Sequence, residues 1–418
     1  MQQIHEGNTG RIEVIDVLRG FTLFGIILVH FTEQYFAGAP PETHAQFTMH
    51  GLPDQIVNSL IGIFIQGKFF MIFSFLFGLS FFIQLNKSDG SRAFLLRFTW
   101  RLVVLFLIGF VHHLNYRGDI LTIYAILGLG LLVSYKLPDK ILLIVALLLV
   151  LDLPSVVTRT IAALDPGSKG PSFFNLEQKP LEIYYDTIKS GSYVAILKAN
   201  FYEFNTKMGF QVESGRIYIT MGLFLLGLYA GRKNIFQDIA LFKRLIRYSL
   251  WTLLGCVLFL VAFFGGTQLA GIELTQPVQW LVGGAGMDIF NAALATIYVG
   301  LIVSLFQKDR WKKRLMNFYS AGRMGLTTYL MQTLIGTLIF FSFGLGLLGD
   351  LGAASCAAIG ILVFILQIIF SNYWLQYFHY GPVEWLWRSL TYLKVQPLRK
   401  RSDYLKNGGT LSSQSVTS

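Results

Sequence analysis

The stretch that decides the fold is RIEVIDVLRGFTLFGIILVHF, which runs from Arg11 to Phe31. It has the length of a membrane-crossing helix, which needs about 20 mainly apolar residues. It nevertheless carries Asp16 and Arg19 where it would enter the bilayer, and His30 where it would leave. A charged side chain inside such a helix costs about 2.5–3.5 kcal/mol. Asp16 and Arg19 are three residues apart, so they share a helix face and can pair. We therefore expect this helix to do more than anchor the protein.

The composition is that of a membrane protein. Of the 418 residues, 54% are hydrophobic and only 14% are charged, and the mean hydropathy is +0.55. A soluble domain carries about 25% charged residues. We predict an all-α, polytopic transmembrane bundle of about ten spans, the second of which is long enough to be broken or strongly tilted. The predicted spans are residues 14–36, 57–85, 94–115, 119–135, 139–159, 216–232, 247–267, 284–306, 322–348 and 352–378.

The positive charge is distributed in an alternating pattern along the chain. Lys and Arg fill every second connection and the C-terminal tail, whereas residues 37–55, 268–283 and 349–351 contain neither. Basic loops stay on the cytoplasmic side of a membrane. The pattern therefore predicts that both termini are cytoplasmic. The same pattern explains the net charge of +11. We therefore expect the lipid bilayer, and not nucleic acid, to be the partner of these basic residues.

Four regions follow from this topology. Residues 1–159 form an N-terminal five-helix half, and residues 216–378 form a C-terminal five-helix half. Between them, residues 160–215 make the one long outer connection, which is either a cap over an outer cavity or a helix on the membrane surface. Residues 379–418 form a cytoplasmic interfacial helix and a disordered tail, because Trp and Tyr stand beside Arg and Lys there.

An inner layer of polar residues is expected near the cytoplasmic helix ends. Guanidinium groups match the geometry of phosphate, so arginines that converge there can bind an anionic donor. The alternative is that these side chains only extend to the membrane surface as anchors. The inner layer comprises Asp16, Arg19, Arg97, Arg101 and Arg323.

Lys68 interrupts the middle of the second span. A buried lysine is costly unless it is paired or faces water. We expect it to pair with Asp16 or Asp119, or to line a polar cavity. The alternative is a helix break at Gln66 and Gly67, with Lys68 reaching an interface.

An outer layer contains histidines and carboxylates, namely His30, Glu33, His112, His113 and Asp119. A tight turn at Gly118 would bring His113 near Asp119. A carboxylate that orients an imidazole makes the arrangement of a general base. The alternative is that Asp119 only caps the next helix. No spacing of His or Cys matches a metal motif, so we expect no metal.

Five blocks along the chain resemble the YeiB-like family of bacterial multipass membrane proteins, whose role has been suspected to be transport. The blocks are DVLRGF at 16–21, GKFF at 67–70 with FSFLFG at 73–78, His113 with GDIL at 118–121, GRMGLTTY at 322–329 with Gln332, and GPVEWLWR at 381–388. The resemblance covers nearly the whole chain and implies a location in the bacterial cytoplasmic (inner) membrane.

The first block is also similar to the opening helix of the transmembrane acyltransferases, such as heparan-α-glucosaminide N-acetyltransferase. This resemblance implies transfer of an acyl group from cytoplasmic acyl-CoA to an acceptor across the membrane by means of a histidine. That histidine follows the first helix in the acetyltransferase, where this chain has His44 and His50. The YeiB-like pattern indicates His113 instead.

The leading hypothesis is therefore a transmembrane acyltransferase that uses acyl-CoA, with acetyl-CoA the expected donor. Arg19, Arg97, Arg101 and Arg323, with Asp16 beside them, would hold the donor phosphates. His113 with Asp119 would be the base, and Lys68 would polarise the thioester. The acceptor would be a small molecule, an envelope glycan or a lipid, and a homodimer remains open. The alternatives are a transporter or exporter of a small solute, which would use the buried charges as a path, and a non-catalytic membrane partner.

Overall fold

The structure is a computed structural model that describes residues 12–38, 40–44, 47–88, 91–164 and 181–400. Within these ranges the chain is helical and forms no β-strand beyond one bridging pair, Phe378 with Arg399. The all-α prediction is confirmed. The helices that cover the predicted spans are α1 (Glu13–Thr32), α2 (Leu52–Phe64), α3 (Phe69–Asn86), α4 (Arg92–Asn115), α5 (Leu121–Ser134), α6 (Asp139–Val150), α7 (Leu153–Leu164), α10 (Arg216–Arg232), α11 (Ile239–Leu269), α12 (Gln276–Phe306), α14 (Tyr319–Arg323), α15 (Gly325–Phe340) and α16 (Ala353–Tyr377).

Shorter helices connect or cover these spans. Among the described residues, six helical segments are long and apolar enough to cross a membrane, or seven if the bent pair α6 and α7 is one span. The break expected in the second span is present, between α2 and α3. The number of ten spans and the orientation of the termini stay predictions. The remaining helices are α8 (Leu181–Ser190), α9 (Tyr193–Glu213), α13 (Asp309–Leu315) and α17 (Pro382–Tyr392), with single turns at Glu42–His44, Ile235–Gln237 and Met316–Phe318.

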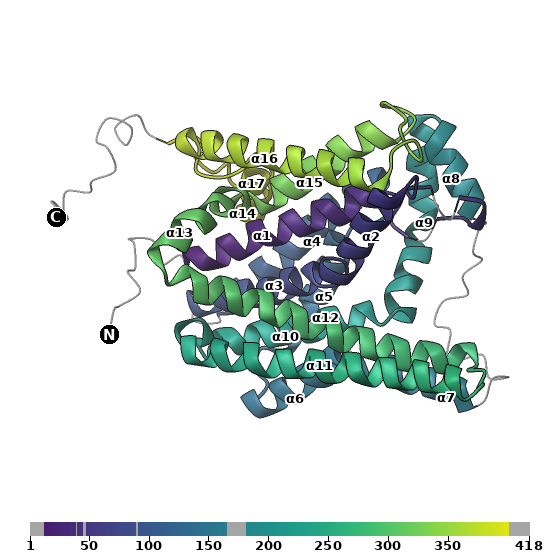
Figure 1. The fold of residues 1–418 in the computed structure, drawn as a ribbon. Coiled ribbons are helices and arrows are strands. Elements are labelled where there is room, and N and C mark those ends of the chain that lie inside the picture. Colours follow the sequence, from purple (N-terminus) through teal and green to yellow (C-terminus); the bar gives the residue numbers. More distant parts are fainter. Residues whose placement is uncertain (1–11, 39, 45–46, 89–90, 165–180, 401–418) are drawn as a thin grey trace, which may run out of the picture.

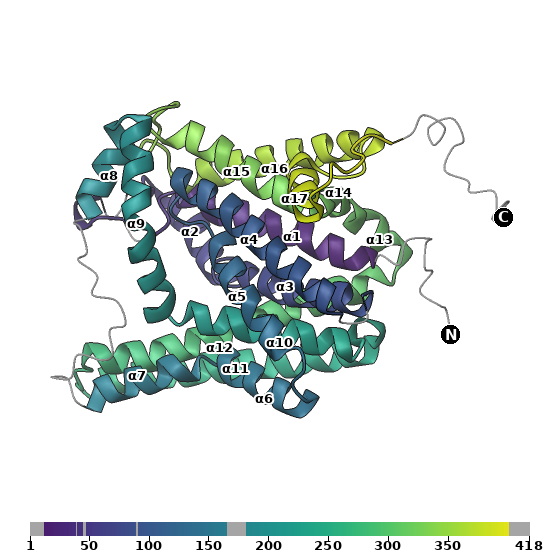
Figure 2. The same cartoon turned by 180° about the vertical axis from the view of Figure 1, so that it is seen from behind.

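Helix α1 runs through the middle of the bundle (Figure 1). Its two ends contribute to two different apolar clusters, one around Leu23 and Ile27 and the other around Val17 and Leu18. Helices α14 to α16 lie on one side of it, and α3, α10 and α12 on the other (Figure 1). Seen from behind, α4 and α17 lie on the opposite face (Figure 2). Helix α11 is peripheral, because only Phe242 and Ser249 of its residues are buried.

Two glycines let the backbones of α1 and α14 touch. A Cβ added to Gly322 would lie 1.8 Å from the carbonyl oxygen of Asp16, and one added to Gly20 would lie 2.0 Å from that of Phe318. Membrane helices use small residues to approach this closely. The crossing places Arg19 and Arg323, each next to one of these glycines, at the same end of the bundle.

A second crossing of the same kind joins α3 to α10. A Cβ on Gly78 would lie 2.0 Å from the carbonyl oxygen of Phe224, and one on Gly227 would lie 2.1 Å from that of Phe75. The first crossing therefore joins α14 to α1, and the second joins α3 to α10.

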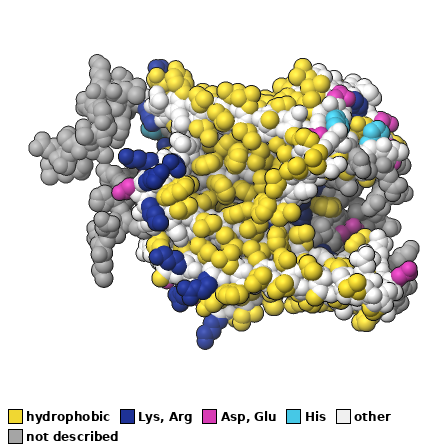
Figure 3. Space-filling model, in the orientation of Figure 1, with side chains coloured by type: hydrophobic (Ala, Val, Ile, Leu, Met, Phe, Trp, Pro, Cys, Tyr) yellow, Lys and Arg dark blue, Asp and Glu magenta, His cyan; other side chains and the backbone are white. Residues whose placement is uncertain are grey.

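The two ends of the molecule differ in charge. Figure 3 shows Lys and Arg side chains at the end near both termini, Asp, Glu and His at the opposite end, and an apolar belt between them. Helices α8 and α9 lie at the acidic end (Figure 1). We name these the basic end and the acidic end. The arrangement supports the predicted orientation, with the basic end in the cytoplasm.

The α1–α14 crossing predicts that Gly322→Ala is destabilising. The new methyl group has no room against the α1 backbone, and overpacking costs about 1–3 kcal/mol or more. We expect a lower melting temperature in detergent, measured by tryptophan fluorescence. Gly255→Ala in α11 is the matched control, since a Cβ there meets no atom within 4 Å. Equal melting temperatures for both variants would show that the close crossing does not constrain the fold.

Candidate functional site

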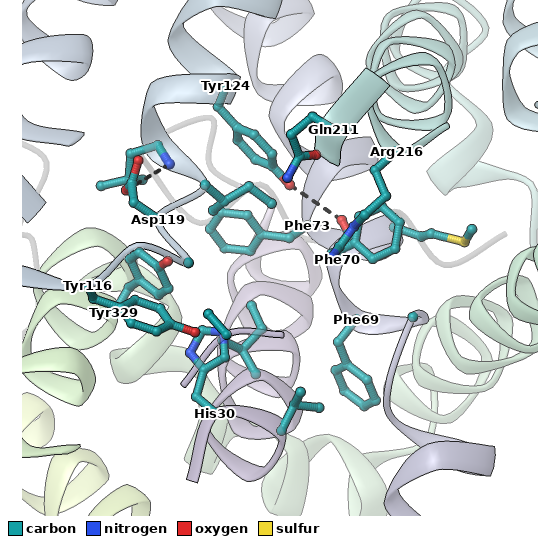
Figure 4. A pocket seen from close by; sticks show the side chains of 18 of the residues that line it. His30, Phe69, Phe70, Phe73, Tyr116, Asp119, Tyr124, Gln211, Arg216 and Tyr329 are labelled. Atoms are coloured by element: carbon teal, nitrogen blue, oxygen red, sulfur yellow. Dashed lines mark hydrogen bonds between the residues drawn. The ribbon is translucent and has the colours of Figure 1, made fainter. Parts of the chain in front are cut away.

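One cavity of about 1290 Å³ connects the inner and outer polar layers. Arg19, Arg101 and Arg323 line it toward the basic end, and His30 and Asp119 line it toward the acidic end. Figure 4 shows its central part, with His30, Tyr116 and Tyr329 on one side and Arg216 and Gln211 on another. The predicted layers therefore belong to a single space.

Three arginines from three different helices form the basic end of this cavity. Arg19 on α1 donates to Asp16 Oδ1 (2.6 Å) and to Ser80 Oγ (2.5 Å). Arg101 on α4 donates to Gln84 Oε1 (2.8 Å), and its guanidinium lies 3.9 Å from the centre of the Trp387 ring. Arg323 on α14 donates to the His379 carbonyl (3.3 Å). Side chains held in this way are positioned before a ligand arrives.

Two members of the expected inner layer do not line the cavity. Asp16 is buried and pairs with Arg19, so it orients that arginine. Arg97 is exposed on α4, where its guanidinium lies 5.2 Å from the centre of the Tyr392 ring. The expectation that Arg97 helps to hold the donor is corrected, because it lies four residues before Arg101, at the helix end rather than in the cavity wall.

Glu384 of α17 joins two of the sequence blocks at the basic end. Its carboxylate accepts hydrogen bonds from the backbone N–H groups of Leu326 (2.6 Å) and Thr327 (3.0 Å), and from Thr327 Oγ1 (2.5 Å). Burial raises the pKa of this carboxyl, although the hydrogen bonds from Thr327 oppose the shift. The carboxylate thus occupies the N-terminus of α15, where the helix dipole favours an anion, and fixes α17 beneath the cavity.

Aromatic rings line the middle of the cavity. They come mainly from α3, whose sequence FFMIFSFLFG places several phenylalanines on the side that faces α1 and α5. Tyr124 of α5 hydrogen-bonds Ser74 through its hydroxyl (2.6 Å). An apolar passage of this kind suits an extended, uncharged chain. The phenylalanines in the lining are Phe47, Phe69, Phe70, Phe73, Phe77, Phe81, Phe98 and Phe210.

His30 of α1 stands in a ring of tyrosines. The centres of Tyr35 and Tyr116 lie 5.3 Å from that of His30, and the centre of Tyr329 lies 6.2 Å away. Its Nδ1 is buried and makes no hydrogen bond with any described residue. The imidazole therefore lines the cavity with one nitrogen that has no hydrogen-bond partner among the described residues.

Asp119 pairs with His112 rather than with His113. Its Oδ1 lies 2.7 Å from His112 Nδ1, and its Oδ2 lies 3.3 Å from Lys207 Nζ. It also accepts from the backbone N–H groups of Leu121 (3.0 Å) and Thr122 (2.9 Å), so it caps α5 as well. The expected His113–Asp119 pair is corrected: adjacent residues point about 100° apart around a helix, and it is His112 that faces the turn.

His113 is held by α9. Its Nε2 lies 2.8 Å from the Asn200 carbonyl oxygen, and its Nδ1 lies 3.3 Å from Lys207 Nζ. It is fully buried and is not among the residues that line the cavity. Because both ring nitrogens are engaged by α9, His113 serves to dock this helix.

Lys68 also departs from its expected place. It is fully buried, and its Nζ donates to the carbonyl oxygens of Gly62 (3.0 Å) and Gln66 (2.8 Å) instead of pairing with Asp16 or Asp119. The ammonium therefore caps the C-terminal end of α2 at the break. Gln66, Gly67 and Phe69 line the cavity, whereas Lys68 does not. The helix break of the alternative interpretation is present, but Lys68 is buried there and does not reach an interface.

Several functional candidates carry no motif in the sequence. Lys207 of α9 is buried between His113 and Asp119, and Arg216 lines the cavity together with Glu33 of the expected outer layer. The mixed polar and aromatic outer segment that carries Lys207 and leads to Arg216 has other charged residues as well, such as Lys198 and Glu203, so nothing in the sequence singles these two out. Within the described part of the chain, no group of three or more His, Cys, Asp or Glu side chains is arranged to hold a metal ion.

Comparison with known proteins finds relatives in bacteria. The family model "Protein of unknown function (DUF418)" matches residues 230–394. "Uncharacterized protein YxaH" of Bacillus subtilis (strain 168) is 31% identical over 94% of this chain and 97% of its own length, and "Uncharacterized protein YeiB" of Escherichia coli (strain K12) is 28% identical over 92% and 97%. The chain belongs to the YeiB-like family. No solved structure matches it.

A third relative extends this YeiB-like group. It is the "Uncharacterized 39.9 kDa protein in amylase 3'region" of Bacillus acidopullulyticus, 28% identical over 94% of this chain and 98% of its own length. The matches run over nearly the whole of each chain. None of the three names describes an activity.

The network around Asp119 predicts that Asp119→Asn is destabilising, by about 3–5 kcal/mol, because Lys207 would then be buried without a counter-charge. We expect a lower melting temperature, and a partial return of stability when Lys207→Met is added. Asp238→Asn is the matched control, since this exposed residue caps α11 through the Leu241 N–H and Asn caps as well as Asp. A double variant no more stable than Asp119→Asn alone would contradict the ion pair.

Proposed function

We propose that this protein is an integral membrane acyltransferase that moves an acyl group from cytoplasmic acyl-CoA, with acetyl-CoA the expected donor, to an acceptor at the opposite side of the bacterial inner membrane. The observation that carries the proposal is the single cavity, with arginines at one end and His30 at the other. Both sets of residues are needed in one space, since the donor's phosphates and its reacting thioester are far apart in the same molecule.

The basic end fits the charged part of the donor. Arg19, Arg101 and Arg323 come from α1, α4 and α14 and face one space. Planar guanidinium groups bind phosphate oxygens in pairs. Their position at the end of the molecule rich in Lys and Arg (Figure 3) is the position from which a cytoplasmic anion would enter.

The length of the cavity fits the uncharged arm of the donor. His30 is eleven residues after Arg19 on α1, which corresponds to about 16 Å at a rise of about 1.5 Å per residue. The passage between them is lined by the phenylalanines of α3. An extended pantetheine arm would lie along these rings and bring its thioester to His30.

His30 is the base in this proposal. The acceptor hydroxyl or amine attacks the thioester carbonyl carbon, and His30 takes the proton from the attacking group. The C–S bond breaks as the C–O or C–N bond forms, and the proton then passes to the thiolate, which leaves as the free thiol. The Tyr116 and Tyr329 rings beside His30 place phenol groups near the developing oxyanion, where hydrogen-bond donors accelerate acyl transfer.

His113, Asp119 and Lys68 take supporting roles. His113 has both nitrogens engaged by α9, so the base that the sequence places at His113 is assigned to His30. Asp119 anchors the turn that carries Tyr116. Lys68 holds the break in the second span and therefore positions Phe69 and Phe70, which line the passage.

The arginine cluster predicts a loss of donor binding in Arg323→Gln. A hydrogen bond to a charged group contributes about 1.5–3 kcal/mol, and about 1.4 kcal/mol is a tenfold change. We expect the Kd of purified protein for acetyl-CoA, measured by isothermal titration calorimetry, to rise at least tenfold. Arg97→Gln, which removes an exposed charge from the same end, is the control and keeps its affinity. Failure of the wild-type protein to bind any acyl-CoA would overturn the proposal.

We predict that the His30→Gln variant loses turnover but keeps its affinity for the acyl-CoA donor. General-base catalysis contributes about 10²–10⁴-fold, so we expect release of free thiol from acetyl-CoA to fall by at least a hundredfold while the Kd stays within twofold. His44→Gln, at an exposed position stacked on Tyr185, is the control. Wild-type turnover in His30→Gln would remove His30 from the mechanism. Solute flux into protein-containing liposomes without acyl-CoA would favour a transporter.

A further inference from the structure

The cavity has a polar wall on the side of the bundle that faces lipid. Asn58 of α2, Gln66 at the helix break, and Asp288 and Asn291 of α12 all line it, and Asn58 and Gln66 are exposed. We call this group the side window. Figure 3 shows the surface hollowed near the acidic end, in the region that lies between α2 and α12 in Figure 1. The cavity therefore opens sideways as well as toward the ends of the bundle.

The break in the second span makes this window. Helix α2 ends at Phe64, Gly67 has a φ of +83°, and α3 begins at Phe69. The Tyr298 hydroxyl donates to the Phe64 carbonyl (2.8 Å), which joins α2 to α12 on the side of the window nearer the basic end. Asn58 precedes Phe64 on α2, and Asp288 precedes Tyr298 on α12. Both residues therefore lie nearer the acidic end than the contact between Tyr298 and Phe64.

Asn291 leaves a hydrogen-bond acceptor for a ligand. Its side chain packs against Gly67, where an added Cβ would lie 2.7 Å from Nδ2. The residue is 8% exposed, and its Oδ1 makes no hydrogen bond with any described residue. A buried polar atom without a partner is costly. The Asn291 carbonyl oxygen can accept a hydrogen bond from a hydroxyl or an amine of a ligand.

The side window offers more hydrogen-bond acceptors than hydrogen-bond donors. Glu33 accepts from Gln66 Nε2 (2.9 Å), and Asp288 lies 3.9 Å from Arg159 Nη1. Both carboxylates line the cavity together with the Asn291 carbonyl. Such a surface suits a head group that carries several hydroxyls or an amine, the same groups that can attack a thioester.

The rim of the window is apolar and exposed. Ile63 and Phe64 of α2 are 49% and 47% exposed, and Met287 of α12 is 52% exposed. In a membrane these side chains contact hydrocarbon. A molecule in the window can therefore keep its head group inside the cavity while its chain stays in the lipid.

We infer that the acceptor is a lipid-anchored hydroxyl or amine compound that enters the cavity sideways from the outer leaflet through the side window. The inference rests on the proposed acyltransferase function and names its acceptor class. The acceptor O–H or N–H gives its proton to His30, the new ester or amide bond forms on the head group as the C–S bond breaks, and free CoA leaves toward the basic end. The acylated lipid returns to the bilayer through the same opening.

The test uses the full chain in two kinds of liposome, one made from total lipid extract of the source bacterium and one from synthetic phosphatidylcholine with the water-soluble envelope fraction added. Each receives radiolabelled acetyl-CoA, and the label is followed into chloroform-extractable and water-soluble products. We expect label in the extractable product of the first liposomes. Label only in water-soluble product would overturn the lipid acceptor and leave the acyltransferase intact. Absence of both acyl-CoA binding and thiol release would instead remove the proposed function itself.

Variants of the side window distinguish binding of the lipid acceptor from binding of the acyl-CoA donor. Asn291→Leu removes the unpartnered carbonyl, so we expect the KM for the lipid extract to rise at least tenfold while the Kd for acetyl-CoA stays within twofold. Gln66→Leu, at the exposed edge, is expected to act in the same direction and serves if Asn291→Leu does not fold. Gln268→Leu, the same change at an exposed position of α11, is the control. Unchanged KM values in the folded window variants would overturn the side entry.

Discussion

The backbone contact between α1 and α14 is the constraint on which the rest of the structure depends. Gly20 and Gly322 leave no space between the two helices, so the rotation of α1 relative to its neighbours is set at that point. Inside a membrane, apolar side chains gain little by moving from lipid to protein, and close packing decides which helices associate. The same contact determines that Arg19 and Arg323 face one space.

Four charged residues of the bundle are each held by a nearby polar group. Arg19 pairs with Asp16, Lys68 caps the end of α2, Lys207 lies against Asp119, and Glu384 caps α15. In hydrocarbon an unsatisfied charge is too costly to keep. His30 Nδ1 and Asn291 Oδ1 are two of the buried polar atoms that have no hydrogen-bond partner among the described residues, and both residues line the cavity.

The two polar layers follow from the chemistry of the two membrane faces, but their connection comes from the helix break. The break at Gln66 and Gly67 separates α2 from α3 within one apolar span, Leu52–Asn86. Gln66, Gly67 and Phe69 line the cavity at this break, and Lys68 caps the end of α2 there.

The helices were predictable from the chain because apolar length decides them, and each predicted stretch contains helix in the structure, although 322–348 ends in a non-helical segment after Phe340. The two layers were predictable too, since Arg19, Arg101, Arg323, His30 and Asp119 line one cavity.

The predictions that failed share a cause. Arg97, Lys68 and His113 have the right residue type at the right depth, but depth does not say which way a side chain points around its helix. That rotation is decided by contacts far apart in sequence: Gly20 with Phe318 and Gly322 with Asp16 across α1 and α14, His112 with Thr333, and His113 with α9. The amino-acid order alone thus determined the helices and the charge of each end, whereas tertiary packing decided which of these side chains share the cavity.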